Sequence, residues 1–389
     1  MRKMRQLRNL NEGQGMLALV RITKDQSRQL DSIRALSALL VLVGHTHQTL
    51  LLPTLQMGST LVGFFTQLSV MVFFVLSGFL IGKSVCNNVS KNGVFNIGQY
   101  ARDRALRLYP PLIAAVLLMA LLAPAAPLLF PSGTHSLLVI PGVNFVRTEF
   151  DVVAKELIGA LAFLNGFKTN TPVANGPLWS LSIEAWYYVL AGALVLWPTR
   201  KWLSGGLLLL TLFITRKMPL FYFLAPVWFA GFGLALWHQR KPEMNNRLFS
   251  RLFVVLSVIV ALTMVLVWNQ SAPAKQGWAD PFNYFRIASG LWFACFLAMI
   301  MGGAARFPAW FDRHAAYSYT LYVIHFPIML FVLGVSQAYI FGSLLKSLII
   351  SGITIIVCIG GAMLIARFAE NKALLLAATV GVKNMVTSK

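Results

Sequence analysis

Long apolar runs recur along the whole sequence, separated by short and mostly basic stretches. A helix needs about 20 apolar residues to cross the hydrocarbon core of a bilayer, and most of these runs approach that length. The runs are continuous and do not alternate between apolar and polar positions, which favours helices over the strands of a membrane barrel. We therefore predict an all-α, polytopic membrane helix bundle with about ten transmembrane helices. The expected spans are residues 33–52, 61–81, 111–130, a fourth from 176, a short fifth to 214, 220–237, 252–268, 284–301, a ninth from 316, and 344–366.

The composition agrees with a membrane protein and adds a strong positive charge. Of 389 residues, 57% are hydrophobic and 12% are charged, and the formal net charge is +21. Such a charge suggests nucleic-acid binding in a soluble protein. Here the basic residues fall largely between the apolar runs, which is typical of cytoplasmic loops beside an anionic leaflet. We expect contact with the lipid bilayer and no nucleic-acid partner. The three cysteines have no zinc-like spacing, so we expect no metal site.

The charge pattern also sets the expected topology. Residues 1–30 form a basic cytoplasmic tail, residues 31–372 the transmembrane domain, and residues 373–389 a cytoplasmic C-terminal tail. We expect most of residues 131–177 to lie outside, with a half-helix near residues 156–163. Arg216 and Lys217 would then also lie outside, against the positive-inside rule, so the topology is least determined between residues 200 and 220.

A few polar residues interrupt the apolar spans. Arg34 and His45 are eleven residues apart, so on a helix they share one face and lie about 16 Å apart along the axis. Glu184 is the acidic residue that lies well inside a span, and His325 lies mid-span beside Pro327. Ionisable groups within spans indicate a protein-lined pocket. Structural roles are the alternative: Arg34 at a helix end, His45 hydrogen-bonded in the bundle, Glu184 paired with an arginine, and His325 bonded to the backbone group that Pro327 leaves open.

A basic segment precedes the third span. Arg104 and Arg107 lie three residues apart, near Arg102, and we expect them on one side of a short helix that Pro110 ends. This segment is either a solvated cytoplasmic loop or a site for the phosphates of a cytosolic ligand. Two function classes follow from the polar residues. One is a transferase with a histidine base, a partner carboxylate and a basic cytosolic mouth; the other is a proton-coupled transporter with a His/Glu relay.

Five motifs in order resemble the integral-membrane acyltransferase-3 family, over roughly residues 30–367. The family's arginine and histidine, separated by ten residues, are matched by Arg34 and His45. Its S-G-F pattern is matched at residues 77–79, and its basic segment before tyrosine and proline at residues 104–110. Its W-S-L-x-x-E-x-x-Y-like stretch is matched by Trp179, Ser180, Leu181, Glu184 and Tyr187, and its Y-S-x-x-L-Y-x-x-H-x-P stretch by Tyr317, Ser318, Leu321, Tyr322, His325 and Pro327.

The resemblance implies an O-acyltransferase of the bacterial inner membrane. Its donor would be acyl-CoA, most simply acetyl-CoA used as a co-substrate, and its acceptor a hydroxyl of an envelope polysaccharide, another carbohydrate or a glycolipid. The expected catalytic residues are His45, Arg34, Glu184 and His325. The expected acyl-CoA-binding residues are Arg102, Arg104, Arg107 and Tyr109. The expected structural or substrate-lining residues are Ser77, Gly78, Trp179, Ser180, Tyr187 and Tyr322.

Two expectations concern how these parts work together. From their depths in the spans, we expect His45, Glu184 and His325 to line one cavity, with Glu184 on its outer side. Some family members carry an added extracytoplasmic hydrolase-like domain, which we do not expect in this chain. Transfer is then completed either by this chain alone or with a separate extracytoplasmic partner protein.

Overall fold

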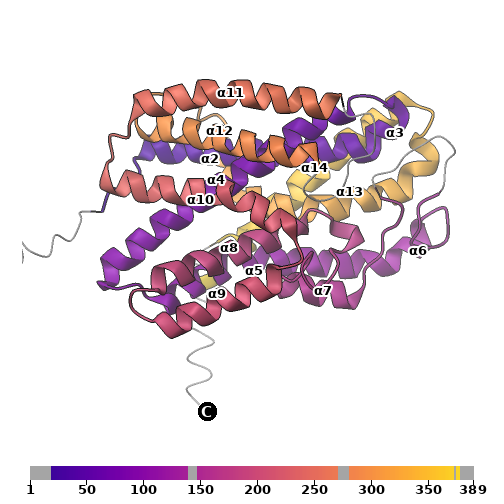
Figure 1. Ribbon diagram of the computed structural model, residues 1–389. Helices are drawn as coiled ribbons and strands as arrows, with labels where there is room; N and C mark the ends of the chain where they lie inside the picture. The colour runs from indigo at the N-terminus through magenta and orange to yellow at the C-terminus, as the bar shows by residue number, and fades with distance from the viewer. Residues whose placement is uncertain (1–18, 139–146, 270–279, 372–373, 377–389) are drawn as a thin grey trace, which may run out of the picture.

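The computed structural model describes residues 19–138, 147–269, 280–371 and 374–376. Within these residues the chain is helical, and two isolated β-bridges stand in place of strands. Nine described helices are long and apolar enough to cross a membrane, and the shorter α9 is also apolar. The all-α bundle of about ten spans is therefore confirmed. Figure 1 shows the long helices lying side by side along one common direction.

The helices follow one another in this order: α2 (Lys24–Thr46), η1 (His47–Leu51), α3 (Leu52–Leu55), α4 (Ser59–Asn92), α5 (Ile97–Leu122), η2 (Ala123–Ala125), α6 (Ala126–Leu129), α7 (Ala154–Leu161), η3 (Val173–Asn175), α8 (Leu178–Leu196), α9 (Lys201–Thr215), α10 (Pro219–Arg240), α11 (Asn246–Trp268), α12 (Pro281–Met301), η4 (Asp312–Tyr317), α13 (Ser318–Ile340) and α14 (Leu344–Ala369). Residues 1–18 and 377–389, in the predicted tails, lie outside the described residues.

The start of α2, the start of α13 and the end of α14 meet at one end of the bundle, which we call the inner end. Arg28 at the start of α2 forms an ion pair of 2.6 Å with Asp312 of η4. The side chain of Glu370, directly after α14, accepts hydrogen bonds from the backbone and side chain of Thr320. This carboxylate satisfies an amide in the first turn of α13 that has no partner within its own helix.

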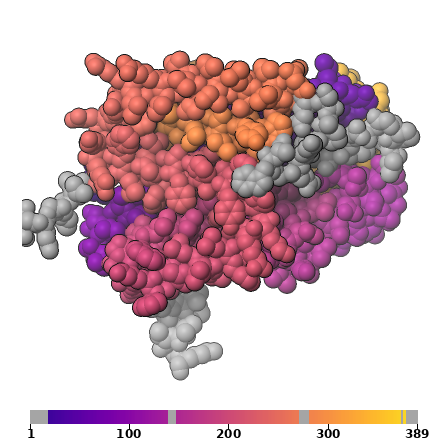
Figure 2. All heavy atoms as spheres, viewed as in Figure 1, coloured from indigo at the N-terminus to yellow at the C-terminus, as the bar shows by residue number. Residues whose placement is uncertain are grey.

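Close packing between α4 and α10 fixes one wall of the interior. A Cβ built on Gly78 would lie 2.1 Å from the carbonyl oxygen of Trp228, and one on Gly231 would lie 2.0 Å from that of Val75. Small residues that let helix backbones approach closely are typical of membrane bundles. By contrast, α11 forms part of the surface in Figure 2, and it exposes apolar side chains such as Val254 and Leu262, as expected for contact with lipid.

One local expectation is wrong. The basic segment is not a short helix ended by Pro110, because α5 runs on through Pro110 and Pro111 to Leu122. Each proline removes only its own backbone donor, and neighbouring helices support the rest of the helix. Residues 154–161 form the expected half-helix, and in the chain that follows Asn165 and Asn175 are fully buried against the bundle. Irregular backbone is tolerated at such depth when protein surrounds it.

This buried segment sets where α8 begins. Asn175 Nδ2 donates to the carbonyl of Val323 at 2.8 Å, which ties the start of α8 to the second turn of α13. From there α8 runs toward the inner end, where the hydroxyl of Tyr100 donates to the carbonyl of Tyr188 at 3.0 Å. Glu184 therefore lies on the inner side of His325, and its predicted position on the outer side is wrong.

Candidate active site

Arg34 and His45 lie on the face of α2 that contacts η4 and α13. Arg34 Nη2 donates to the carbonyl of Ala315 at 3.2 Å and lies 3.1 Å from Asp31 Oδ1. The ring of His45 stacks on the ring of His325, with centroids 5.4 Å apart and planes inclined by 29°. These two contacts are ten residues apart along η4 and α13, in agreement with the separation of about 16 Å expected along α2.

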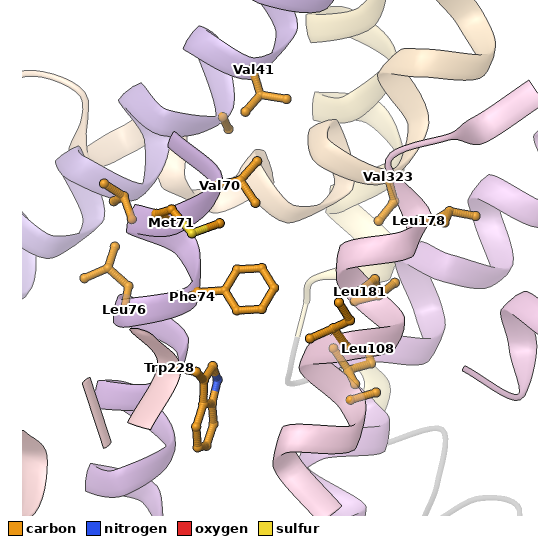
Figure 3. Packing of buried hydrophobic residues seen from close by; sticks show 14 of the residues in the cluster. Val41, Val70, Met71, Phe74, Leu76, Leu108, Leu178, Leu181, Trp228 and Val323 are labelled. Atoms are coloured by element: carbon orange, nitrogen blue, oxygen red, sulfur yellow. The ribbon is translucent and has the colours of Figure 1, made fainter. Parts of the chain in front are cut away.

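A cavity opens between α2, α4, α5, α8 and α13, with an empty volume of about 750 Å³ that includes solvent at its mouth. Its walls are mostly apolar. Figure 3 shows Phe74 of α4 pointing across the space toward α8, which carries Leu181. The charged residues in its lining are Arg34, Arg104, Arg107 and Glu184. The remaining lining residues are Val70, Phe73, Leu76, Ser77, Leu80, Ile81, Leu108, Ser180, Tyr188, Ser318, Tyr319 and Tyr322.

Tyr322 separates this cavity from the histidine pair. Its hydroxyl forms a hydrogen bond of 2.6 Å with Ser180 Oγ, and its ring packs edge-on against Phe73 at 5.5 Å. The ring of His325 follows one turn later on α13, 6.1 Å from the ring of Tyr322. His45 and His325 are therefore next to the cavity without forming part of its lining.

Some of the predicted residues lie elsewhere. Arg102 is exposed and does not line the central cavity. Tyr109 faces a neighbouring apolar groove, where its ring contacts Phe163 at 5.3 Å. Trp179 packs against the hydrophobic core, and the hydroxyl of Tyr187 donates to the carbonyl of Phe221.

Glu184 is held by a directed chain of hydrogen bonds. Trp228 Nε1 can only donate, so it donates to Ser77 Oγ at 3.2 Å. Tyr188 donates its hydroxyl to Glu184 Oε1 and lies 3.1 Å from Ser77 Oγ, which completes the chain when Ser77 donates to Tyr188. No arginine among the described residues lies within ion-pair distance of Glu184. The structure therefore does not support the alternative in which Glu184 pairs with a structural arginine.

The structural role considered for His325 is also not supported. Pro327 has no backbone N–H, so it leaves the carbonyl of Val323 without its helical partner. Asn175 Nδ2 donates a hydrogen bond to that carbonyl in place of the missing N–H, as described above. His325 Nδ1 instead bonds the carbonyl of Leu321 at 3.0 Å, and its Nε2 is buried and finds no hydrogen-bond partner in the described part of the chain. Because a carbonyl only accepts, Nδ1 carries the proton and Nε2 offers a lone pair.

Sequence analysis missed three residues that shape this site. Tyr188 lies four residues after Glu184 on α8, a spacing that places both on one helix face, so its contact was open to prediction. Asn175 and Arg147 lie in the segment that was expected outside. A Cβ on Gly176 would lie 2.7 Å from Arg147 Nη2, so this side chain packs against the start of α8.

Comparisons with known proteins agree with the motifs. Neither the curated proteins nor the solved structures give a match to this chain. One family model, described as an acyltransferase domain, matches residues 27–367 and so covers nearly the whole chain, including the cavity and both histidines. The resemblance seen in the sequence is thereby confirmed. The chain belongs to the acyltransferase-3 family and is an integral-membrane acyltransferase.

Proposed function

We propose that the protein transfers an acetyl group from acetyl-CoA to a hydroxyl of an envelope polysaccharide, another carbohydrate or a glycolipid. The observation that carries this proposal is the cavity between the basic helix segment of α5 and the stacked histidine pair. It offers cations where a polyanionic cytosolic donor would arrive, apolar walls for its arm, and imidazole bases beyond its far end. The proposed location is the bacterial inner membrane, with the inner end facing the cytoplasm.

The arginines of the cavity suit the phosphates of the donor. Arg104 and Arg107 lie three residues apart on α5, and both also line a polar pocket at the mouth with Asp103 and Glu370. Arg104 Nε and Arg34 Nε are buried and have no hydrogen-bond partner among the described residues. Guanidinium groups with free donors are well suited to phosphate oxygens. In our proposal Arg104 and Arg107 bind the CoA phosphates, while Arg34 binds a polar group further along the cavity.

Glu184 has a donor-side role in this proposal. Its Oε1 accepts from Tyr188, which leaves its other carboxylate oxygen for a ligand in the cavity. The pantetheine arm of CoA carries amide N–H groups, which a carboxylate accepts well. Glu184 thus fixes the arm below Tyr322 and does not contact the acceptor hydroxyl.

The chemical step takes place at the histidine pair, which the thioester reaches past Tyr322. The acceptor oxygen attacks the thioester carbon while His45 Nε2 takes the hydroxyl proton. The C–O bond forms, the C–S bond breaks, and the leaving CoA thiolate recovers the proton from the imidazolium. His325 Nε2 lies beside this ring as a second lone pair that can bind the hydroxyl proton or a polar group of the acceptor.

The transporter alternative needs a connected proton relay between the carboxylate and the histidines. The hydrogen bond of Glu184 runs instead to Tyr188, whose hydroxyl is bonded in turn to Ser77 and not to His325. Among the described residues no hydrogen bond connects Glu184 to either histidine of the pair. This arrangement favours the transferase.

Purified protein in detergent tests the proposal directly. It is incubated with acetyl-CoA and with envelope glycans as acceptor, and the release of free CoA thiol is followed. Mass spectrometry of the glycans then identifies the acetylated hydroxyl. We expect thiol release that depends on acceptor and needs no proton gradient. Turnover that occurs only in sealed vesicles with an imposed pH difference would instead favour a proton-coupled transporter. Thiol release that needs an added protein would establish a separate extracytoplasmic partner.

A further inference from the structure

The helix that carries His45 changes its winding one residue after it. α2 ends at Thr46, and residues His47–Leu51 continue as the π-helical turn η1. Such turns are rare inside helices and frequently mark functional sites. Here the change accompanies a side-chain contact, because Gln48 Oε1 lies 3.1 Å from His45 Nδ1. Both side chains remain partly accessible, whereas the stacked His325 is fully buried.

The contact between Gln48 and His45 decides which ring nitrogen can act as a base. An amide oxygen only accepts, so facing Gln48 Oε1 the imidazole carries its proton on Nδ1 and keeps a lone pair on Nε2. If the amide nitrogen of Gln48 faced Nδ1 instead, neutral His45 would carry its proton on Nε2 and could not receive one there.

The surroundings of the ring explain why an amide suits this position. The ring of His45 packs against the stacked His325 and against the edge of Phe326 at 5.3 Å. Among the described residues no carboxylate forms an ion pair with this ring. An uncharged acceptor orients the ring without stabilising the imidazolium as strongly as a carboxylate would. The amide of Gln48 therefore orients the ring without placing a charge beside it.

We propose that Gln48 is the positioning residue for His45 and holds Nε2 free for the acceptor hydroxyl. This inference rests on the proposed function, since it assumes that His45 is the base. It assigns Gln48 the role that a carboxylate has in other histidine-based sites, where the third group fixes the tautomer and orientation of the ring.

Three variants test this role: Gln48→Leu, Gln48→Glu and, as a matched control, Thr49→Val. Leucine removes the hydrogen-bond acceptor at nearly constant size. An ionised glutamate keeps the acceptor and has no donor that could face Nδ1. Thr49→Val removes a different hydrogen bond of η1, from Thr49 Oγ1 to the carbonyl of His45 at 2.7 Å, without touching the ring. Each purified variant is assayed for acceptor-dependent thiol release across pH, and its affinity for acetyl-CoA is measured by titration.

We expect Gln48→Leu to lower kcat by about 10- to 1,000-fold, below the full effect of a general base, with donor affinity unchanged. Gln48→Glu should retain activity, with the acid limb of its pH–rate profile moved to higher pH because a carboxylate favours the imidazolium. Thr49→Val should resemble the wild type. Equal kcat in Gln48→Leu and the wild type would overturn the role of Gln48. An inactive but folded Gln48→Glu with an active Gln48→Leu would also overturn it.

The failure of the inference can be told apart from failure of the proposed function. If His45→Ala retains turnover, the base itself is wrongly assigned. If His45→Ala is inactive while every Gln48 variant keeps the wild-type pH profile and kcat, the base stands and its orientation by Gln48 is refuted.

Discussion

Replacing Gly78 with alanine tests how the packing of α4 against α10 supports the site. The new Cβ would lie 2.1 Å from the carbonyl oxygen of Trp228, whereas carbon and oxygen normally approach to about 3.3 Å. The helices must therefore separate by roughly 1 Å. The hydrogen bond from Trp228 Nε1 to Ser77, now 3.2 Å, would lengthen past its limit, and Ser77 begins the chain that reaches Glu184.

Three free-energy contributions set the expected change in the stability of Gly78→Ala. Overpacking of this kind costs about 1–3 kcal/mol, and loss of one hydrogen bond costs about 1 kcal/mol. Alanine recovers about 1 kcal/mol of helix propensity relative to glycine. We expect a net destabilisation of about 1–3 kcal/mol together with weaker binding of acetyl-CoA.

The matched control is Gly233→Ala, on α10, where a Cβ would meet no atom within 4 Å. Thermal unfolding of both variants in the same detergent, together with titration of acetyl-CoA, gives the comparison. Gly78→Ala should unfold at a lower temperature than the wild type, and Gly233→Ala at an equal or higher one. If Gly78→Ala is as stable as Gly233→Ala and binds the donor normally, the packing argument is refuted.

Three further predictions concern the cavity and its borders. Arg104→Ala and Arg107→Ala should each weaken acetyl-CoA binding. The loss of affinity should be larger at low salt, because added salt screens the contacts between the arginines and the phosphates. Arg251→Ala, at an exposed position of α11, serves as the control in isothermal titration. Glu184→Gln should fold normally and weaken the binding of acetyl-CoA. If this variant binds acetyl-CoA normally but no longer transfers the acetyl group, Glu184 acts on the acceptor and not on the donor. Asn175→Leu leaves a buried carbonyl without its donor and should lower stability by about 1–3 kcal/mol, measured by thermal unfolding.

The sequence was sufficient to predict the helices, because the cost of exposing backbone groups to lipid makes each long apolar run a helix. It also placed Arg34 and His45 correctly, since helical spacing alone decides which side chains share a face. Neither result depends on how the helices pack. The five motifs are likewise local in sequence, and the family that they resemble is the one whose model matches residues 27–367.

The wrong predictions concern residues whose position in the bundle depends on how the helices pack against one another. Glu184 was placed from the predicted outer start of its helix, but a buried segment held by Asn175 starts α8 deeper in the bundle. Pro110 was taken as a helix end, although neighbouring helices support α5 through it. The contact of Asn175 with the carbonyl of Val323 joins residues that are 148 positions apart, and hydropathy carries no information about such a pairing.

The measurement that tests the central claim most directly compares His45→Ala with His47→Ala. His47 is the first residue of η1, two residues after His45, and its ring approaches Gly58. Both purified proteins are assayed for acceptor-dependent release of CoA thiol, after gel filtration and acetyl-CoA titration establish that each is folded. The account predicts that His45→Ala loses about 10²–10⁴-fold in rate while His47→Ala stays near the wild type. Near-normal turnover in a folded His45→Ala protein would contradict it.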